Sequence, residues 1–162
     1  MTSMAAPRLF VIVATEASEA VIVRRGPSRW SHVIRWNLRD DSFHPGAWLK
    51  GRIYPERCDL SPNGKLLLYF ALHGNRENYY STYSAVSRTP WLKALALWAE
   101  MGTWGGGGRF LTSSHVGLRS GRLKPGGTDR MIVDLCDMSP DPQPAPEWAS
   151  QRLQRYGKNG DI

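Results

Sequence analysis

A histidine that follows three hydroxyl side chains is the arrangement in this sequence closest to a nucleophilic site. His115 comes directly after Thr112, Ser113 and Ser114. An imidazole beside a hydroxyl can accept its proton and so activate the oxygen as a nucleophile. Serine and threonine are also ordinary residues of loops and turns. The sequence therefore leaves open both an enzyme with a site near His115 and a structural turn.

Three acidic residues near the middle of the chain could act in pairs. Carboxylates that lie close together can bind a cation or transfer protons, and the candidates are Asp40, Asp41 and Asp59. Asp40-Asp41-Ser42 also has the composition of a hairpin turn, because short polar side chains bond back to the local backbone. We therefore predict turn roles for these acids and assign no catalytic residue.

The most unusual segment places a run of glycines between an aromatic and a basic residue: Trp104, Gly105, Gly106, Gly107, Gly108 and Arg109. Glycines let a ligand approach the backbone closely, and the arginine could hold an anion. The ending of a phosphate-binding loop, Gly-Lys-Ser/Thr, is missing. The segment can be a flexible loop between strands or a binding loop of undefined ligand. As a binding loop, we predict that it is either mobile until a partner orders it, or packed where a side chain would collide with neighbouring backbone.

Basic residues are concentrated in two segments. The chain has 21 Lys and Arg against 14 Asp and Glu, a net charge of +7. The segment 24–57, which includes the candidate binding residues Arg24, Arg25 and Arg29, has eight basic and three acidic residues, and the segment 109–130 has five and one. Basic side chains with aromatic neighbours suit phosphate contacts and base stacking. The alternative is a solvated basic surface.

The cysteine and histidine spacing predicts no metal site, and no cofactor is expected. No CxxC or HxxxH pair is present, which removes the usual zinc patterns. Cys58 and Cys136 each stand beside an aspartate in an apolar context, where a free thiol packs like a small hydrophobe. The longest apolar run near the start, Leu9–Ala14, is shorter than the roughly 20 residues of a spanning helix. With no export signal, these features predict a cytoplasmic protein without a membrane segment.

The elements that must position these residues read as short strands. Leu9–Ala14 and Ala20–Val23 are joined by about five polar residues, which predicts a hairpin. A turn at Gly26-Pro27-Ser28 leads to Ser31–Leu38. There the alternation places His32, Ile34, Trp36 and Leu38 on one face, which we predict to be the buried one.

The middle of the chain continues this pattern. We predict a turn region at His44-Pro45-Gly46 and a strand over Trp48–Tyr54. A tight turn at Ser61–Gly64 should then feed Lys65–Ala71, a nearly continuous apolar run that is typical of a strand covered on both faces. Tyr79–Ser87 alternates aromatic and hydroxyl residues and should be the neighbouring strand.

One turn and the strand after it form a recognisable motif. Cys58-Asp59-Leu60 and Ser61-Pro62-Asn63-Gly64-Lys65 precede the apolar run Leu66–Phe70. This stretch, Cys58 to Phe70, resembles one repeat of the WD40-like β-propellers of the TolB type, whose blades carry a Ser-Pro-Asp-Gly-Lys turn before an apolar strand. A blade takes about 40 residues and a propeller has about four to eight blades. The chain shows no second copy of the turn, so we favour blade-like hairpins over a closed propeller.

The fold class that follows is mainly β, an antiparallel meander or blade-like sheets with a short C-terminal helix. Pro90–Glu100 could be a helix, although Ala94–Trp98 fits a strand almost as well. Pro146–Tyr156 is the predicted C-terminal helix, with Gly157 as its cap. We expect a β-rich domain over residues 1–139, and a Pro-rich connector and helix over residues 140–162 that pack on the same domain.

Three functions remain open. The first is a non-enzymatic binding module, an accessory subunit that recognises a protein partner through sheet edges and Trp-bearing loops, since Trp and Arg dominate many interfaces. The second is a nucleic-acid-binding accessory protein that uses the basic segments on DNA or RNA. The third is an enzyme with a site near His115. An exposed apolar patch favours the first function, and one continuous positive face favours the second.

Overall fold

The protein is built almost entirely from strands. The computed structural model describes residues 6–27, 29–73, 81–100, 102–119 and 131–135. In these ranges the strands are β1 (Arg8–Val13), β2 (Glu19–Arg25), β3 (Trp30–Asn37), β4 (Ser42–Ile53), β5 (Asp59–Leu60), β6 (Leu66–His73), β7 (Thr82–Arg88), β8 (Ala94–Glu100), β9 (Gly108–Phe110), β10 (His115–Leu118) and β11 (Met131–Asp134). A short 3₁₀ turn, η1 (Pro55–Arg57), follows β4.

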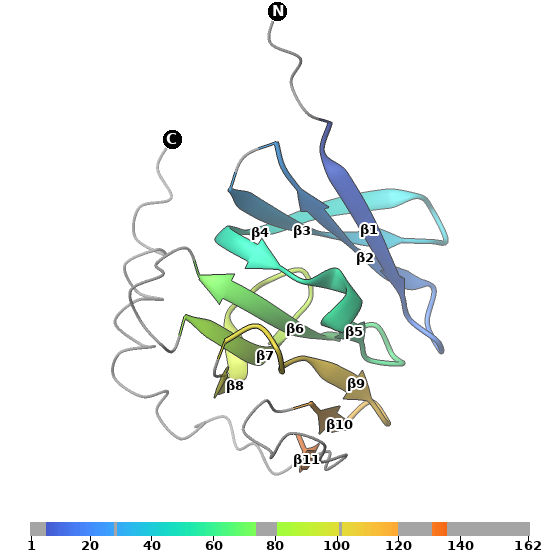
Figure 1. Ribbon diagram of the computed structural model, residues 1–162. Coiled ribbons are helices and arrows are strands. Elements are labelled where there is room, and N and C mark those ends of the chain that lie inside the picture. Colours follow the sequence, from blue (N-terminus) through green and yellow to red (C-terminus); the bar gives the residue numbers. More distant parts are fainter. Residues whose placement is uncertain (1–5, 28, 74–80, 101, 120–130, 136–162) are drawn as a thin grey trace, which may run out of the picture.

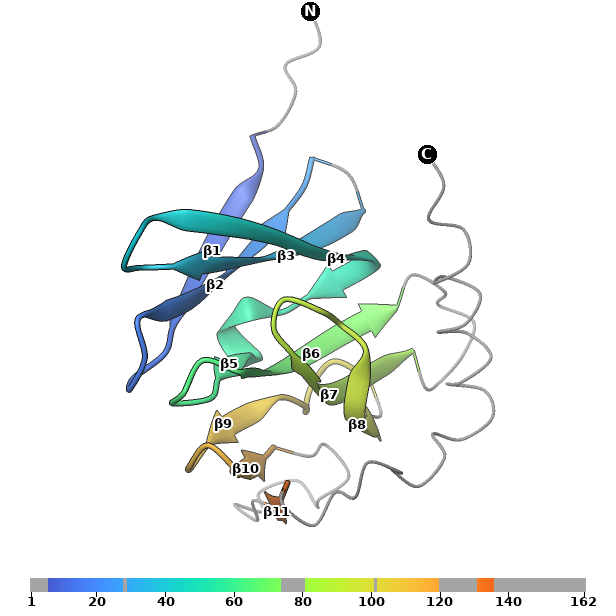
Figure 2. The same ribbon diagram turned by 180° about the vertical axis from the view of Figure 1, so that it is seen from behind.

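The strands form two sheets in which every pair is antiparallel. The larger sheet has the order β1-β2-β3-β4-β6-β7-β8, with β5 pairing the start of β6, and the smaller sheet has the order β11-β10-β9. The larger sheet curls into a half-barrel (Figures 1 and 2). The prediction of a mainly β, antiparallel meander is therefore confirmed.

Strand β6 lies at the centre of this arrangement and is covered on both faces. Leu67, Tyr69 and Ala71 belong to one apolar cluster, together with Val23 of β2 and other residues. Leu68 belongs to a second cluster on the opposite face, which reaches β10. The predicted strand covered on both faces is therefore confirmed, and its successive side chains point to opposite faces.

The turn before β6 forms as its residues predict. Gly64 has φ +73°, and its N–H donates to the carbonyl oxygen of Ser61 at 2.8 Å. Asn63 Oδ1 accepts from the Ser61 hydroxyl at 2.8 Å and from the Lys65 N–H at 3.1 Å. A short polar side chain thus closes the turn onto its own backbone. The likeness to a TolB-type blade stays a prediction, since β6 here belongs to one continuous curled sheet.

Strand β4 joins the two halves of the larger sheet. Its first part pairs with β3, whereas Gly51, Arg52 and Ile53 pair with β6. The turn predicted at residues 44–46 is wrong, because these residues lie within β4. Proline is tolerated there because the register shifts between His32 and Ile34 of β3, and proline in sheets is found at such irregular positions.

The buried face of β3 is also the reverse of the prediction. Val33 is fully buried and packs in the cluster with Val21 and Val23. Residues directly opposite one another in an antiparallel pair share a face, and Val33 is opposite Val23 whereas Ile34 is opposite Ile22. The face that carries Ile34 therefore points away from the core.

The two helices expected from the sequence have different outcomes. Pro90–Glu100 is not a helix: residues 94–100 form β8, which pairs with β7 over its whole length. The aromatic and aliphatic spacing there was compatible with either state, and pairing with β7 decides between them. The predicted connector at 140–146 and helix Pro146–Tyr156 lie outside the described residues, as does Cys136.

Truncation of either core-facing leucine tests the central position of β6. Leu67 and Leu68 are fully buried, one in each cluster, so Leu67→Ala and Leu68→Ala should each lower the free energy of unfolding by about 2–5 kcal/mol. Urea denaturation followed by tryptophan fluorescence measures this. Leu9→Ala is the control, because Leu9 is 60% exposed and its loss should stay within about 0.5 kcal/mol. Equal losses at all three positions would contradict a β6 buried on both sides.

Candidate functional site

The side of strands β1–β4 that points away from the core is an apolar surface, here called the outer face. Cross-strand pairs such as Val11 with Ile22, and Ile22 with Ile34, assign its members to one side. Its large apolar side chains are Leu9, Val11, Val13, Ile22, Trp30, Ile34, Trp36, Phe43 and Trp48. Leu9, Val11, Val13, Phe43 and Trp48 are all at least half exposed. Contiguous exposed apolar surface of this kind marks interaction sites in many proteins.

Aromatic rings on β3 and β4 form two stacked pairs on the outer face. His32 lies flat on Trp48, with 4.0 Å between ring centroids and an interplanar angle of 4°. Trp36 stacks on Phe43 at 5.5 Å, and its Nε1 donates to Asp41 Oδ1 at 3.0 Å. Stacking orients Trp48 and Phe43, while each side chain stays about half exposed. Binding of a ligand to these two rings therefore costs little side-chain conformational entropy.

The charged side chains that strands β1–β4 place on the outer face are positive, whereas the Asp41 carboxylate of the β3–β4 turn lies beside Trp36. The guanidinium of Arg24 lies 5.9 Å from the centre of the Trp48 ring, and Lys50 is exposed on the same face, opposite Trp30. None of the strand residues that point to this face is acidic. Burial, more than any other cause, lowers the pKa of His32, so this ring is neutral at pH 7 and contributes as an aromatic group.

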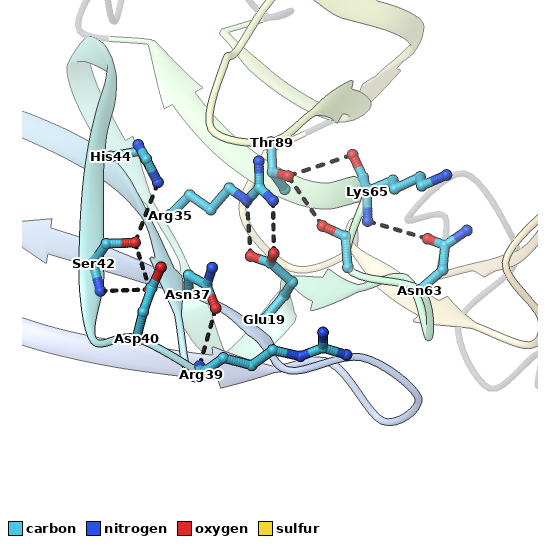
Figure 3. Close-up of polar contacts among 11 residues, drawn as sticks. Glu19, Arg35, Asn37, Arg39, Asp40, Ser42, His44, Asn63, Lys65 and Thr89 are labelled. Carbon is cyan, nitrogen blue, oxygen red and sulfur yellow. Dashed lines mark hydrogen bonds and ion pairs between the residues drawn. The ribbon is translucent and has the colours of Figure 1, made fainter.

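Glu19, the one acidic residue in strands β1–β4, lies on the side of the sheet opposite the outer face. Glu19 accepts from Arg35 Nε at 2.7 Å and from Arg35 Nη2 at 2.6 Å (Figure 3). This paired hydrogen bond lowers the pKa of Glu19. The structure also separates two neighbouring arginines that the sequence grouped together. Arg24 is on the outer face, whereas Arg25 points to the opposite side, across from Arg8.

The glycine run is packed against neighbouring backbone, which is the second of the two predicted states. Gly105, Gly106 and Gly107 are buried. Gly106 and Gly107 have φ of +89° and +78°. A Cβ at Gly106 would overlap the ring of Phe70, and one at Gly107 would overlap the carbonyl oxygen of Arg57. These glycines are needed because the backbone passes directly over its neighbours.

The side chain of Arg57 holds this segment in place through hydrogen bonds. Its Nη1 donates to the carbonyl oxygens of Thr103 at 2.6 Å and Gly105 at 2.7 Å. The same guanidinium lies over the rings of Tyr54 and Phe70, at 5.6 and 5.2 Å from their centroids. The cation thus serves the fold rather than an anionic ligand.

The remaining members of the predicted binding loop are split between core and solvent. Trp104 is 91% exposed. Gly108 and Arg109 open β9, and the Arg109 side chain lies 3.8 Å from Asp59. Arg29 is exposed in the β2–β3 connection. Both views place that connection at the top of the molecule and β9 at its lower end (Figures 1 and 2), so the predicted binding residues do not form one site.

The hydroxyl and histidine cluster is a hairpin turn. His115 Nδ1 lies 3.0 Å from Ser114 Oγ and 3.1 Å from Thr112 Oγ1, and its Nε2 lies 3.3 Å from Asp134 Oδ2. Thr112 Oγ1 also accepts the N–H groups of Ser114 and His115, which closes the turn between β9 and β10. The His115 and Asp134 side chains are more than a third exposed. The cluster thus lacks the enclosed setting in which oriented dipoles stabilise a transition state.

Of the three acidic residues near the middle of the chain, Asp40 and Asp41 lie in the β3–β4 turn as predicted, whereas the turn role predicted for Asp59 is wrong, because Asp59 lies in β5 and bonds to β9. Asp40 Oδ1 accepts from the Ser42 N–H at 3.0 Å and from the Ser42 hydroxyl at 2.7 Å (Figure 3). These bonds lower the pKa of Asp40. Asp59 Oδ2 accepts the N–H of Phe110 at 2.8 Å and so ties β5 to β9. Among the described residues no group of three His, Cys, Asp or Glu side chains could hold a metal ion.

The thiol and membrane expectations can be examined in the same part of the chain. Cys58 is free and buried, and burial raises its pKa to about 12. This confirms the free, packed thiol that the sequence predicts for Cys58. In the described ranges no helix has the length and apolar character needed to cross a bilayer.

Comparison with known proteins adds no assignment. No family model matches the chain, and neither the curated proteins nor the solved structures yielded a match. The candidate site therefore rests on the geometry of the outer face.

Sequence reasoning missed this face. Leu9, Val11 and Val13 alternate with Phe10 and Ile12, which are equally apolar, so the pattern of β1 resembles a strand buried on both sides. The one available signal was the excess of apolar residues at both parities in β1, β2 and β3, which exceeds what one core-facing side can bury.

Two glycines with the same backbone conformation separate packing from strain. Gly102 and Gly107 both have φ +78°, but nothing lies within 4 Å of a Cβ at Gly102. Gly102→Ala should lower the free energy of unfolding by about 1–2 kcal/mol from the left-handed conformation alone. Gly107→Ala should cost about 1–3 kcal/mol more, because the Arg57 backbone must also move. Urea titration of both variants measures the difference, and equal losses would argue against the packed glycine run.

Proposed function

We propose that the protein is a non-enzymatic binding module that recognises a protein partner through the outer face of β1–β4, as an accessory subunit of a larger complex. The observation that supports this is the row of exposed apolar side chains across four adjacent strands, with stacked aromatic rings at one end. A cytoplasmic setting belongs to the proposal. There a free thiol such as Cys58 stays reduced.

Burial of this face by a partner would be strongly favourable. Completing the burial of a half-exposed Leu, Val or Phe side chain gains roughly half of the 1.5–3 kcal/mol associated with full burial. Leu9, Val11, Val13 and Phe43 are in this range of exposure. Trp48, with Arg24 beside it, combines the two residue types most enriched at the energetic centres of interfaces. An aliphatic strip next to an aromatic pair suits an apolar surface of another protein.

A pair of exposed tryptophans provides the test. Trp48 lies on the outer face and is 52% exposed, and Trp91 lies in the β7–β8 connection and is 57% exposed. Immobilised protein is exposed to nuclease-treated cytoplasmic extract, and the retained polypeptides are quantified. Trp48→Ser should lose a specifically retained polypeptide, whereas Trp91→Ser should keep it. Trp104→Ser, in parallel, reports whether the exposed loop tip adds to the same interface. Equal retention by the Trp48 and Trp91 variants would contradict the proposal.

A second function is favoured by one specific feature, the arginine beside a half-exposed indole on a face without acidic strand residues. Single-stranded nucleic acids bind to surfaces where bases stack on aromatic rings and basic groups contact phosphates. Trp48 and Phe43 would supply the rings, and Arg24 and Lys50 the charges. This alternative places DNA or RNA on the same outer face.

Adjacent arginines on opposite faces make a matched pair for this alternative. Arg24→Gln and Arg25→Gln each remove one charge, but only Arg24 points to the outer face. Binding of fluorescent single-stranded DNA and RNA is followed by anisotropy across a salt series. Arg24→Gln should weaken binding and flatten its dependence on salt, because one phosphate contact and its released counterion are lost. Arg25→Gln should resemble the parent. An absence of binding at low salt would exclude the nucleic-acid alternative.

A further inference from the structure

Strand β1 ends the larger sheet, and among the described strands only β2 is hydrogen-bonded to it, although β1 also packs near β5. It pairs with β2 along its whole length, from Arg8 opposite Arg25 to Val13 opposite Ala20, without a register shift. Figures 1 and 2 show β1 on the margin of the sheet. Such an edge is a template for pairing with another strand.

The direction of the free hydrogen-bonding groups follows from one bond. The Ala14 N–H donates to the carbonyl oxygen of Glu19 at 2.9 Å. In an antiparallel ladder the residues that bond to a given neighbour alternate, so Phe10 and Ile12 bond to β2. The N–H and C=O groups of Leu9, Val11 and Val13 therefore point to the open edge.

The residues of β1 from Leu9 to Val13 carry none of the protective features that sequence can supply to an edge strand. Proteins blunt free edges with lysine, proline, bulges or inward-pointing charges. None of these occurs between Leu9 and Val13. The strand is instead apolar on both sides: Leu9, Val11 and Val13 are exposed on the outer face, and Phe10 is 39% exposed on the other. An added strand would cover apolar surface on both sides of the sheet.

We infer that a second copy of this chain occupies the edge, pairing β1 with β1 antiparallel about a twofold axis at Val11. In this register Val11 faces Val11 of the second copy, Leu9 faces Val13, and Phe10 faces Ile12. Every residue from Leu9 to Val13 then has an apolar partner on its own side of the sheet. A centre at Phe10 would place Val13 against Pro7, and a centre at Ile12 would place Leu9 against Thr15.

The charges at the two ends of β1 are complementary in the same arrangement. Arg8 precedes the apolar residues and Glu16 follows them, and both are exposed. Arg8 also lies opposite the like charge of Arg25 on β2. Among the described residues, Arg8, Arg25 and Glu16 have no ion pair. Antiparallel pairing brings Arg8 opposite Ala14 of the second copy. Glu16 of that copy lies beyond the end of β1, in the β1–β2 connection, where its N–H donates to the carbonyl oxygen of Pro62 at 2.9 Å. It therefore stands at the same end of the interface as Arg8.

The expected dimer is weak. Stable interfaces bury about 1,200–2,000 Å² in total, and a single six-residue edge strand supplies less than this. Interfaces of about 1,600 Å² already extend to micromolar affinity, so this dimer should form at micromolar concentration or above. It would join the outer faces of both copies into one apolar surface, with Leu9, Val11 and Val13 at its centre.

Sedimentation velocity over a concentration series tests the dimer. Val11→Lys adds a charge at the centre of the edge. Val11→Pro removes an N–H that points away from β2 and fixes φ, a change that edge strands tolerate. Circular dichroism checks that both variants keep the fold. Leu111→Lys is the matched control, because Leu111 is 49% and Val11 50% exposed. The parent and Leu111→Lys should dimerise with increasing concentration, and both Val11 variants should raise the dissociation constant at least tenfold. A parent that stays monomeric, or equal behaviour of the Val11 and Leu111 variants, would overturn the inference.

Cross-linking tests the register. In a background with Cys136→Ser, the remaining Cys58 is buried. Val11→Cys places two thiols on directly opposed residues, whose Cα atoms lie about 5.5 Å apart in a hydrogen-bonded pair. Leu9→Cys places them about 14 Å apart along the strands. A short bifunctional thiol reagent should therefore link Val11→Cys to itself, and should link Leu9→Cys efficiently only to Val13→Cys. Efficient self-linking of Leu9→Cys, or none at Val11→Cys, would overturn the proposed pairing.

Discussion

The burial of β6 on both of its faces is the constraint on which the rest of the structure depends. Leu67, Tyr69 and Ala71 face one apolar cluster, and Leu68 faces the other. A strand of this kind needs cover above and below, and backbone partners on both edges. The chain meets these needs with β4 and β5 on one edge, β7 on the other, and the glycine run packed against Phe70.

The glycine run is thereby explained as part of the fold. Its backbone lies so close to Phe70 and to the carbonyl oxygen of Arg57 that side chains are excluded. Arg57 in turn spends its hydrogen bonds on this segment. An anion at the same place would have to compete with backbone carbonyl oxygens already bound to the cation. In this part of the chain Trp104 is the side chain left exposed for contact with a partner, because the packed loop presents it to solvent.

The apolar outer face has the opposite character. One side of β1–β4 packs with the central strand, β6. Val21, Val23 and Val33 all lie on that side. The same strands carry a second apolar set that no described element covers. Apolar side chains in water add nothing to folding, and rings already stacked in pairs present a fixed shape. The binding role proposed for this face accounts for both features.

Local patterns were enough to predict the β-rich class, the Ser61–Gly64 turn and the two-sided burial of β6, because turn chemistry and apolar alternation act over a few neighbouring residues. They also established which residues of β3 share a face. Which of the two faces would meet the core was beyond them, since both sets contained apolar side chains and the answer depends on where β6 lies. The strand at residues 94–100, the opposite orientations of Arg24 and Arg25, and the free edge of β1 were likewise decided by pairing between distant segments. Sequence periodicity predicts which side chains share one face of a strand. Only the tertiary structure shows which elements cover that face.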